Sequence, residues 1–458
     1  MTLFSAAQAA RWLITRYPGH KYRDLLAKSE NWSRQELQSF RDSKLQALIN
    51  HCYENVPYYR HLMDQRGIVP SDIKSTSDLN GFPILTKADV RAHQRDLLAQ
   101  NISRMKTSWT KTGGTTGEPI RVCKNIDCVA MAAACYARGL RWGGLLPTAP
   151  RVRLFGGSLG MDRERRSKRI GAFLRGELFI PAFELRSKTA AEYFRQIRQS
   201  RARFLIGYAS AIFRLATLAK ERNEEIEFET VFPTAELMLD EWERTIRNVF
   251  KCRVLPYYGS GEVNSLGFCR PGSRNYVVPE EHVLIEILRS DGSLAEHGDG
   301  RFVVTDLDNY AMPIIRYLNG DAGKLVPPQN SSPCKEIERL DGRFNSFLMT
   351  DSGELVSGVI GTHIFRHTVS VKRYQVIQEE PRRLVIKVIP KNEFSEHDSQ
   401  LLRQLFSKYL GGGIKLEIEL VSDLPLPPSG KSVFVINRCL EDSTDSLTTP
   451  RVNREQYK

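Results

Sequence analysis

A run of threonine and glycine, Thr112-Gly-Gly-Thr-Thr-Gly-Glu-Pro119, contains the residue types that point most directly to chemistry. Three glycines let the backbone turn so that several N–H groups converge, and such nests bind phosphate oxygens. The threonine hydroxyls add donors, and a hydroxyl can also ligate Mg²⁺. The run lacks the Gly-Lys-Ser/Thr ending of a Walker A loop, and a strand rather than a helix is predicted after it. Taken alone, it fits a phosphate site or a plain surface loop.

Three later segments carry charged side chains at turns. Tyr257-Tyr-Gly-Ser-Gly-Glu262 follows a predicted strand, where a carboxylate can hold a metal on a nucleotide. Pro313-Ile-Ile-Arg-Tyr-Leu-Asn-Gly-Asp321 is predicted to end a strand with Arg316 and Asp321 exposed, suited to phosphate and to ribose hydroxyls. Pro428-Ser-Gly-Lys431 places a lysine on a turn between two strands. Singly, each segment also has a structural interpretation: a turn, a strand-end ion pair or a solvated lysine.

The elements that must position these residues follow an alternating pattern. Apolar positions at helical spacing predict helices within residues 34–66, interrupted at Pro57. Short apolar runs at 151–155, 203–207, 231–235 and 253–257 alternate with helices at 188–200, 209–221 and 239–250. This alternation predicts an α/β fold with a mainly parallel sheet. From 280 to 326 the pattern is rich in strands, at 282–288, 300–305 and 314–317.

After about Arg343 the character of the chain changes. Strands at 373–378 and 383–388, a helix at 396–409 and strands at 415–420 and 433–436 predict a separate α+β domain. We therefore expect a large domain over residues 1–342 and a small one over 343–440. The polar tail, residues 441–458, is predicted to be disordered.

The order of these motifs resembles that of the adenylate-forming (acyl-AMP-forming) superfamily. Two early stretches, Asn55-Val-Pro-Tyr-Tyr59 and Phe82-Pro-Ile-Leu-Thr-Lys87, are similar to one branch, the phenylacetate–CoA ligase-like and CapK-like proteins. The resemblance runs from about Leu45 to Arg438. It implies a large adenylation domain with mixed, mainly parallel sheets and a small, mobile C-terminal lid domain.

The resemblance also implies a role for each matching residue. Lys431 would be the lysine that the small domain brings in for adenylation, and Glu262 would help to hold Mg²⁺. Asp321 would bind the ribose hydroxyls, and Arg343 would lie near the ribose and phosphate at the start of the hinge. The other implied ATP contacts are Thr112, Gly113, Gly114, Thr115 (also near Mg²⁺), Thr116, Gly117, Glu236, Tyr258, Gly259, Ser260 and Arg316; the implied acid pocket contains Tyr208, Ser210 and Ala235.

The implied function is ATP-dependent activation of a small carboxylic acid as acyl-AMP with release of pyrophosphate. The acyl group would then pass to a thiol, amine or hydroxyl acceptor, with a role in capsule or exopolysaccharide biosynthesis. One alternative is an aryl- or phenylacetyl-type CoA ligase. Another is a degenerate, non-catalytic nucleotide-binding scaffold of polysaccharide assembly. The implied cofactors are ATP and Mg²⁺, with CoA as a candidate, and a homodimer is a candidate assembly.

The sequence departs from the family pattern at three places. Gly261 stands where the superfamily often has Thr or Ser, so one phosphate hydroxyl is missing. The hinge run after Gly342 is of the CapK-like type, which weakens CoA as the acceptor. Of the zinc ligands that some relatives carry, Cys269 and Cys334 remain, two short of a tetrahedral site. We therefore predict no structural zinc.

Composition and charge limit the class of protein. The 458 residues are 41% hydrophobic and 26% charged, which is typical of a globular chain, and no apolar run is long enough to span a bilayer. The eight cysteines show no disulfide spacing, so a cytoplasmic protein is expected. The formal net charge is +13, yet no nucleic-acid-binding motif is present and no nucleic-acid partner is expected.

The positive charge is concentrated in one segment. Residues 151–203 contain fourteen basic and five acidic side chains, and the densest part is 163–169. Such runs are usually solvated faces. The alternative is a docking patch for an anionic membrane or a phosphorylated carrier sugar, which would bring the protein to the inner face of the membrane.

Overall fold

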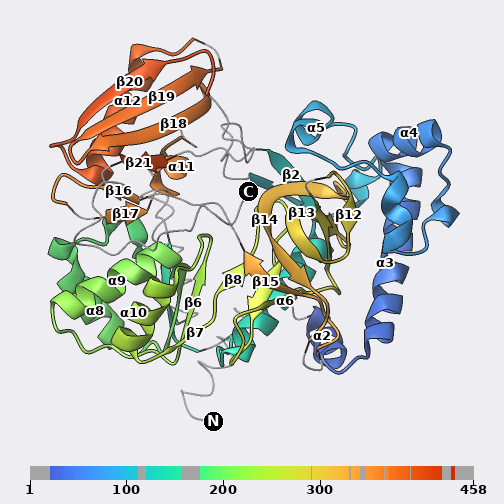
Figure 1. The fold of residues 1–458 in the computed structure, drawn as a ribbon, viewed down its shortest axis with the longest axis horizontal. Helices are drawn as coiled ribbons and strands as arrows, with labels where there is room; N and C mark the ends of the chain where they lie inside the picture. The colour runs from blue at the N-terminus through green and yellow to red at the C-terminus, as the bar shows by residue number, and fades with distance from the viewer. Residues whose placement is uncertain are drawn as a thin grey trace. The chain divides into compact units, whose positions relative to one another are not determined.

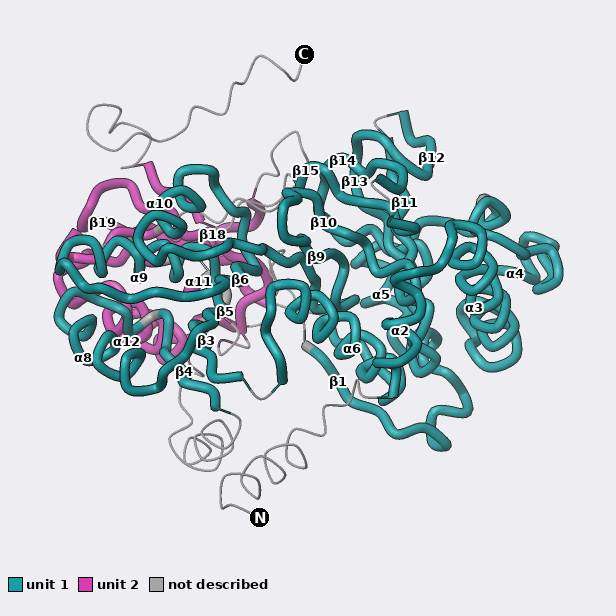
Figure 2. Tube along the Cα trace, turned by 90° about the horizontal axis from the view of Figure 1, so that it is seen from below, with its two compact units in different colours: residues 1–112, 119–343 teal, residues 113–118, 344–458 magenta. Residues whose placement is uncertain are grey.

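The structure, a computed structural model, forms two compact units (Figure 2). The described residues up to 340 belong to unit 1, and those from 347 onward belong to unit 2. The structure describes residues 21–111, 120–147, 149–155, 176–289, 291–329, 332–340, 347–353, 355–357, 359–365, 368, 370–391, 393–424 and 435–438.

Unit 1 contains a five-stranded sheet in the order β4-β3-β5-β6-β7, and every neighbouring pair in it is parallel. All five residues of β6 are buried, as expected for a parallel strand covered on both faces. Helices α8, α9 and α10 pack beside this sheet (Figure 1). The bounds are β3 (Arg151–Phe155), β4 (Glu177–Pro181), α8 (Ser187–Ser200), β5 (Phe204–Tyr208), α9 (Ala209–Glu221), β6 (Thr230–Thr234), α10 (Asp240–Phe250) and β7 (Arg253–Val254).

The second sheet of unit 1 has eight strands in the order β12-β11-β13-β14-β15-β10-β9-β8, all paired antiparallel. The predicted α/β class with mixed sheets is confirmed: the sheet over residues 151–254 is parallel, and two strand pairs of unit 2 are parallel as well. The strands are β8 (Tyr257–Tyr258), β9 (Gly267–Cys269), β10 (Tyr276–Val277), β11 (Val283–Leu288), β12 (Leu294–Ala295), β13 (Gly298–Asp306), β14 (Tyr317–Val326) and β15 (Glu336–Leu340).

The N-terminal helices of unit 1 lie beside the antiparallel sheet (Figure 1). A capping box at Ser33 starts the long helix α3, and Pro57 then occupies the first turn of α4, where its missing N–H is tolerated. The predicted interruption at Pro57 is therefore the start of a second helix. The elements are α2 (Arg23–Ser29), α3 (Arg34–Asn55), α4 (Pro57–Arg66), α5 (Lys87–Ala92), β1 (Thr107–Lys111), β2 (Arg121–Asn125) and α6 (Ile126–Trp142), with β1 and β2 paired antiparallel.

Strand β14 corrects one prediction. The sequence pattern predicted a strand over 314–317 that ends before Asp321, but the strand begins at Tyr317 and continues to Val326. Arg316 has a left-handed φ of 50°, and its N–H donates to Thr305 Oγ1 at 2.9 Å, so the extended strand starts only after it. Tyr317, Asn319 and Asp321 alternate with less buried residues and lie on one face of β14.

Unit 2 is an α+β unit built on a four-stranded sheet in the order β20-β19-β18-β21. The Gln378 amide is fully buried on β18: Nε2 donates to the carbonyls of Met349 and Pro381, and Oε1 accepts from the Met349 N–H and from Asn437. The elements are β16 (Phe347–Met349), β17 (Leu355–Ser357), α11 (Val359–Phe365), β18 (Val371–Glu380), β19 (Arg383–Pro390), α12 (Glu396–Leu410), β20 (Lys415–Leu420) and β21 (Val435–Asn437).

Two further features concern the surface and the cysteines. Over the described ranges, no helix combines the length and the apolar character needed to cross a bilayer. The seven cysteines in those ranges are all unpaired.

The densest basic run, 163–169, lies outside the described residues, so its proposed docking role stays a prediction. Five described arginines of the 151–203 segment form ion pairs with glutamates: Arg151 and Arg153 with Glu177, Arg195 with Glu192, Arg198 with Glu224 and Arg203 with Glu229.

Candidate active site

The carboxyl ends of the parallel strands bring the predicted acid-pocket residues to one edge of the sheet. Strands β3, β5 and β6 are neighbours and end at Phe155, Tyr208 and Thr234. The rings of Phe155 and Tyr208 meet edge to face with centroids 5.2 Å apart. In open α/β sheets, ligands bind at this edge of the sheet.

Ser210, Ala235 and Glu236 meet at the same edge. The N–H of Ser210, in the first turn of α9, donates to Glu236 Oε2 at 2.7 Å. A carboxylate is stabilised at a helix N-terminus, so this contact fixes the end of β6 to the start of α9. Ala235 has a φ of 68°, an uncommon left-handed value for a residue other than glycine. Ser210 Oγ is buried and has no hydrogen-bond partner among the described residues.

Tyr258 and Asp321 are joined directly. Tyr258 Oη donates to Asp321 Oδ2 at 2.8 Å, and Asn319 Nδ2 donates to Tyr258 Oη at 2.7 Å. Asn319 Oδ1 in turn accepts from the Asp321 N–H at 3.0 Å. Asp321 is 9% exposed, so the expectation that it is exposed at a strand end is wrong. Burial follows from its position on the inward face of β14.

Glu262 lies close to the same strand. Its carboxylate is 6% exposed and accepts from the Tyr317 hydroxyl at Oε1, 3.1 Å away. The turn before it is closed by Ser260, whose Oγ donates to the Val263 carbonyl at 2.9 Å and accepts from the Val263 N–H at 3.0 Å. Two predicted site residues thus meet one face of β14: Asp321 lies on that face, and Glu262 is hydrogen-bonded to Tyr317 on it.

Arg316 is also placed differently from the expectation. Its guanidinium is 1% exposed and pairs with both carboxylate oxygens of Glu286, at 3.0 Å from Nε and 2.6 Å from Nη2. Nη1 donates to the Phe82 carbonyl at 3.3 Å. The predicted exposure of Arg316 is therefore wrong, and the alternative interpretation of this motif as a strand-end ion pair describes what the structure contains. A phosphate contact of Arg316 stays a prediction.

The two early stretches that carry the branch resemblance pack against residues 313–318. Tyr59 Oη donates to the Pro313 carbonyl at 3.1 Å and accepts from the Ile315 N–H at 3.2 Å. The Leu85 N–H donates to the Arg316 carbonyl, and Leu85 also bridges to Tyr317. Segments far apart in the sequence therefore brace the start of β14, which carries Asp321.

Several predicted site residues lie outside the described ranges: Thr112, Gly113, Gly114, Thr115, Thr116, Gly117, Arg343 and Lys431. The strands on either side of the Thr/Gly run are described, and Lys111 of β1 pairs with Arg121 of β2. The strand predicted to follow the run is thus present. The roles implied for these residues stay predictions.

Sequence reasoning missed Tyr317, Asn319 and Lys124. Tyr317 and Asn319 could have been found from the alternation Tyr-x-Asn-x-Asp, which places polar side chains on the face that bears Asp321. Lys124 lies on β2 and is 1% exposed. No pattern in the sequence distinguishes it from a surface lysine.

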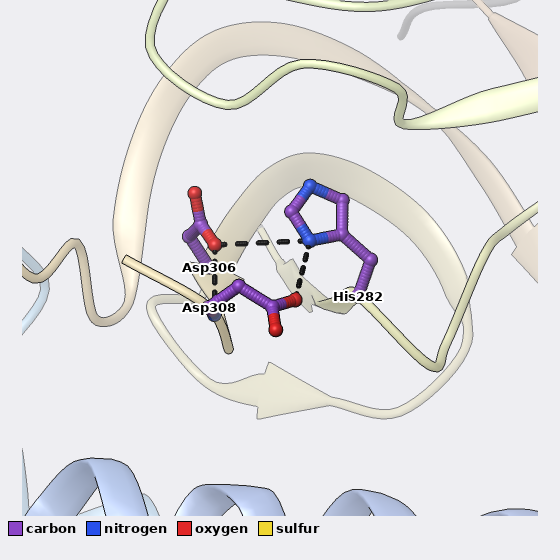
Figure 3. A group of neighbouring side chains, drawn as sticks. All are labelled: His282, Asp306 and Asp308. Atoms are coloured by element: carbon purple, nitrogen blue, oxygen red, sulfur yellow. Dashed lines mark hydrogen bonds and ion pairs between the residues drawn. The ribbon is translucent and has the colours of Figure 1, made fainter. Parts of the chain in front are cut away.

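A second buried cluster has the composition of a metal site (Figure 3). His282 Nδ1 lies 2.8 Å from Asp308 Oδ2 and 3.8 Å from Asp306 Oδ1. The remaining carboxylate oxygens are engaged, because Lys44 Nζ donates to Asp308 Oδ1 at 2.7 Å and Cys128 Sγ donates to Asp306 Oδ2 at 3.3 Å. A metal-ligating histidine normally donates its second N–H to a partner, but His282 Nε2 has none in the described part of the chain. We interpret the cluster as an internal hydrogen-bond network.

The charges in this cluster affect one another. Burial alone would raise the pKa of Asp308, but the Lys44 ammonium and the His282 ring outweigh burial and lower it. The Asp308 N–H also donates to Asp306 Oδ1 at 3.0 Å. The network therefore fixes the loop that leads from β13 to β14.

Comparison with known proteins finds similar sequences for this chain. The family model described as the CapK C-terminal domain matches residues 348–438. The phenylacetate-coenzyme A ligase of Aromatoleum evansii is 27% identical over 339 residues, covering 70% of this chain and 73% of that protein. The phenylacetate-coenzyme A ligase of Escherichia coli (strain K12) is 28% identical over 341 residues, covering 70% and 74%.

Solved structures support the fold. A 2-hydroxyisobutyryl-CoA ligase in complex with 2-HIB-AMP and CoA, in the thioesterification state, has a TM-score of 0.62 at 17% identity and covers 90% of this chain and 92% of that one. The same ligase in the postadenylation state has a TM-score of 0.57 at 18% identity, with 90% and 91% covered. These matches support the family suspected from the motifs: the chain is similar to phenylacetate-coenzyme A ligases over 70% of its length and to the CapK C-terminal domain over residues 348–438.

Proposed function

We propose that this protein activates a carboxylic acid with ATP, forming acyl-AMP and pyrophosphate, and then transfers the acyl group to an acceptor. The observation that carries the proposal is the placement of two carboxylates. Asp321 lies on β14 and accepts a hydrogen bond from Tyr258, and Glu262 accepts one from Tyr317 on the same face of that strand. These are the two carboxylates that the superfamily resemblance assigns to the ribose and to Mg²⁺.

In the proposed reaction a carboxylate oxygen of the acid attacks the α-phosphorus of ATP, and the bond to pyrophosphate breaks. Catalysis of phosphoryl transfer depends mainly on positioning and on stabilising the negative charge that develops. Asp321 would bind the ribose hydroxyls and so orient the α-phosphate. Lys431 and the Thr/Gly run at 112–117 would stabilise charge on the phosphates.

Glu262 fits a role as a ligand of Mg²⁺. It offers a hard oxygen ligand, which Mg²⁺ prefers, and it is 6% exposed. Within the described ranges no cationic side chain pairs with it, and a buried carboxylate without a cation is unfavourable. Bound Mg²⁺ would supply charge neutralisation on the phosphates. Thr115 is the proposed second protein group near the ion.

The acid would bind at the carboxyl edge of the parallel sheet. Phe155 and Tyr208 provide aromatic surface there, and Ser210 Oγ is a buried hydroxyl that a polar group of the acid could satisfy. Glu236 would act indirectly, because its carboxylate holds the start of α9 through the Ser210 N–H.

CoA is the first candidate acceptor, because the curated relatives are phenylacetate-coenzyme A ligases. The match of residues 348–438 to the CapK C-terminal domain supports a second candidate, a sugar amine or hydroxyl in capsule or exopolysaccharide synthesis. A reaction that uses cellular ATP is in keeping with a cytoplasmic protein. If the acceptor is a sugar of capsule or exopolysaccharide synthesis, we propose that residues 163–169 also contact the membrane.

The experiment that tests the proposal is ATP–pyrophosphate exchange with a panel of carboxylic acids that includes phenylacetate and 2-hydroxyisobutyrate. At least one acid should drive exchange in the wild type, and Lys431→Ala should abolish it. Absence of exchange with every acid would contradict catalytic adenylation. CoA and amino sugars are then added separately to the active mixture, and the mass of the acyl product identifies the acceptor.

A further inference from the structure

Lys124 is a buried cation whose ammonium binds the turn that carries Glu262. Its side chain is 1% exposed, and Nζ lies 3.4 Å from the carbonyl oxygen of Gly261. The Asn264 amide is oriented with its oxygen toward Lys124 and its nitrogen toward Ser260. In this orientation Oδ1 accepts from Lys124 Nζ at 3.2 Å, and Nδ2 donates to the Ser260 carbonyl at 3.0 Å. The ammonium therefore contacts this turn on both sides of Glu262.

The charge of Lys124 is not neutralised by any carboxylate in the described part of the chain. Burying an ammonium without an anionic partner is unfavourable, and two neutral oxygen acceptors compensate it only in part. A lysine in such a position lowers the stability of the folded chain relative to an apolar side chain of similar length. Groups that are kept at the expense of stability are concentrated at functional sites.

The position of Lys124 in the chain connects two parts of the site. It lies on β2, the strand that follows the Thr/Gly run, and its ammonium reaches the turn between β8 and β9. Among the described residues, hydrogen bonds within the turn and the Tyr317 hydroxyl also hold Glu262 in place there. A charged donor makes a stronger hydrogen bond than a neutral one of the same geometry, so this lysine adds a constraint on the turn.

We propose that Lys124 is a positioning residue for Mg·ATP: it fixes the backbone on both sides of Glu262 and adds a positive charge beneath the turn. The inference rests on the proposed function, since it assigns Glu262 to the metal–nucleotide complex. Lys124 itself is too buried to touch the nucleotide, so it acts through Glu262.

The test compares Lys124→Met, Lys124→Gln and Lys220→Met with the wild type. Methionine removes the donor and the charge, whereas glutamine keeps a donor and removes the charge. Lys220 is exposed in the last turn of α9, so Lys220→Met is the matched control. Each protein is measured for its Tm, for Mg·ATP affinity by isothermal titration without any acid, and for the Mg²⁺ dependence of ATP–pyrophosphate exchange.

Lys124→Met should keep or raise the Tm and bind Mg·ATP about tenfold more weakly, the loss expected for one charge-assisted hydrogen bond. It should need more Mg²⁺ for half-maximal exchange, with the KM of the acid unchanged. Lys124→Gln should recover part of the affinity, and Lys220→Met should match the wild type. If Lys124→Met has a lower Tm but binds Mg·ATP as the wild type does, Lys124 is a structural residue and the proposal is overturned. Wild-type Mg·ATP affinity at an unchanged Tm would overturn it as well.

The outcomes separate this proposal from the proposed reaction. If the wild type binds Mg·ATP but no acid drives ATP–pyrophosphate exchange, adenylation is contradicted. The comparison of Mg·ATP affinities between wild type and Lys124→Met still decides the role of Lys124. Normal exchange in the wild type with equal Mg·ATP affinity in Lys124→Met contradicts only the role of Lys124.

Discussion

The Tyr258 hydroxyl donates to Asp321 across 2.8 Å, although three strands separate β8 from β14 in the order of the sheet. In a flat sheet, four steps of about 4.8 Å would place the two backbones about 19 Å apart. The contact therefore requires the antiparallel sheet to curl so that its β8 edge approaches β14. This curl brings the 258–262 turn next to Asp321.

Replacing Tyr258 with phenylalanine should weaken the ribose site more than it weakens the fold. The change removes the donor to Asp321 Oδ2 and the hydrogen bond from Asn319 Nδ2 to the Tyr258 hydroxyl. We expect the free energy of unfolding to fall by about 1 kcal/mol and the KM for ATP to rise about tenfold, with the KM of the acid unchanged. Urea unfolding and steady-state exchange measure the two effects. An unchanged KM for ATP would contradict a ribose-binding role for Asp321.

The Arg316–Glu286 pair should behave as a structural ion pair. Arg316→Met leaves the Glu286 carboxylate buried and unpaired, so the free energy of unfolding should fall by about 3–5 kcal/mol. The double variant Arg316→Met/Glu286→Gln should recover part of this loss, and urea unfolding measures the difference. If the double variant folds like the wild type but has lost Mg·ATP affinity, then Arg316 contacts phosphate after all.

The sequence predicted most of the elements and their types, because their apolar periodicity is strong. Strand β3, helix α9 and strand β20 have the predicted bounds. The start of β14 was misplaced because the interruption at Arg316 depends on a hydrogen bond to Thr305, eleven residues away in the chain. No local pattern encodes that contact.

The same distinction applies to the site. Motif order was enough to name Glu262, Tyr258 and Asp321, since each lies in a short, recognisable run. Tyr317 and Lys124 were missed because their importance comes from contacts 55 and 137 residues away in the chain. The burial of Arg316 could not be predicted either, because its partner Glu286 is on another strand.

Acid should remove part of the stability of unit 1 through Glu281. Burial alone would raise the pKa of this carboxyl, but the Arg138 guanidinium and the Ser29 hydroxyl outweigh burial and lower the pKa from 4.5 to about 2. A folded-state pKa below the unfolded value stabilises the protein above pH 4.5, and this stability is lost as the pH falls toward 2. The shift corresponds to about 3 kcal/mol at pH 7 and about 2 kcal/mol at pH 3.5.

Glu281→Gln tests this pH dependence. The difference in unfolding free energy between wild type and variant, from urea unfolding, should be largest at pH 7 and should narrow below pH 4.5. A difference that stays constant from pH 7 to pH 3.5 would contradict a lowered pKa for Glu281.

Gly411 in unit 2 should not tolerate a side chain. Its φ is 103°, and an added Cβ would lie 2.0 Å from the Asp351 carboxylate, which also accepts from the Gly413 N–H. Gly411→Ala should lower the free energy of unfolding by about 1–3 kcal/mol. Gly412→Ala is the matched control, because the nearest atom to its Cβ, Ser407 Oγ, is 3.7 Å away. Thermal unfolding of the two variants measures the difference, and equal values of Tm would contradict the clash.

The central claim is that the carboxylate of the acid attacks the α-phosphorus of ATP. The most direct test traces the carboxylate oxygen into the products. The acid that gives the fastest exchange is labelled with ¹⁸O in its carboxylate and incubated with Mg·ATP and hydroxylamine as the acyl acceptor. Adenylation predicts that the products are AMP, carrying one ¹⁸O atom, and unlabelled pyrophosphate, because the attacking carboxylate oxygen stays on phosphorus when the acyl group leaves. Formation of ADP with ¹⁸O in inorganic phosphate would show attack at the γ-phosphorus and would contradict the account.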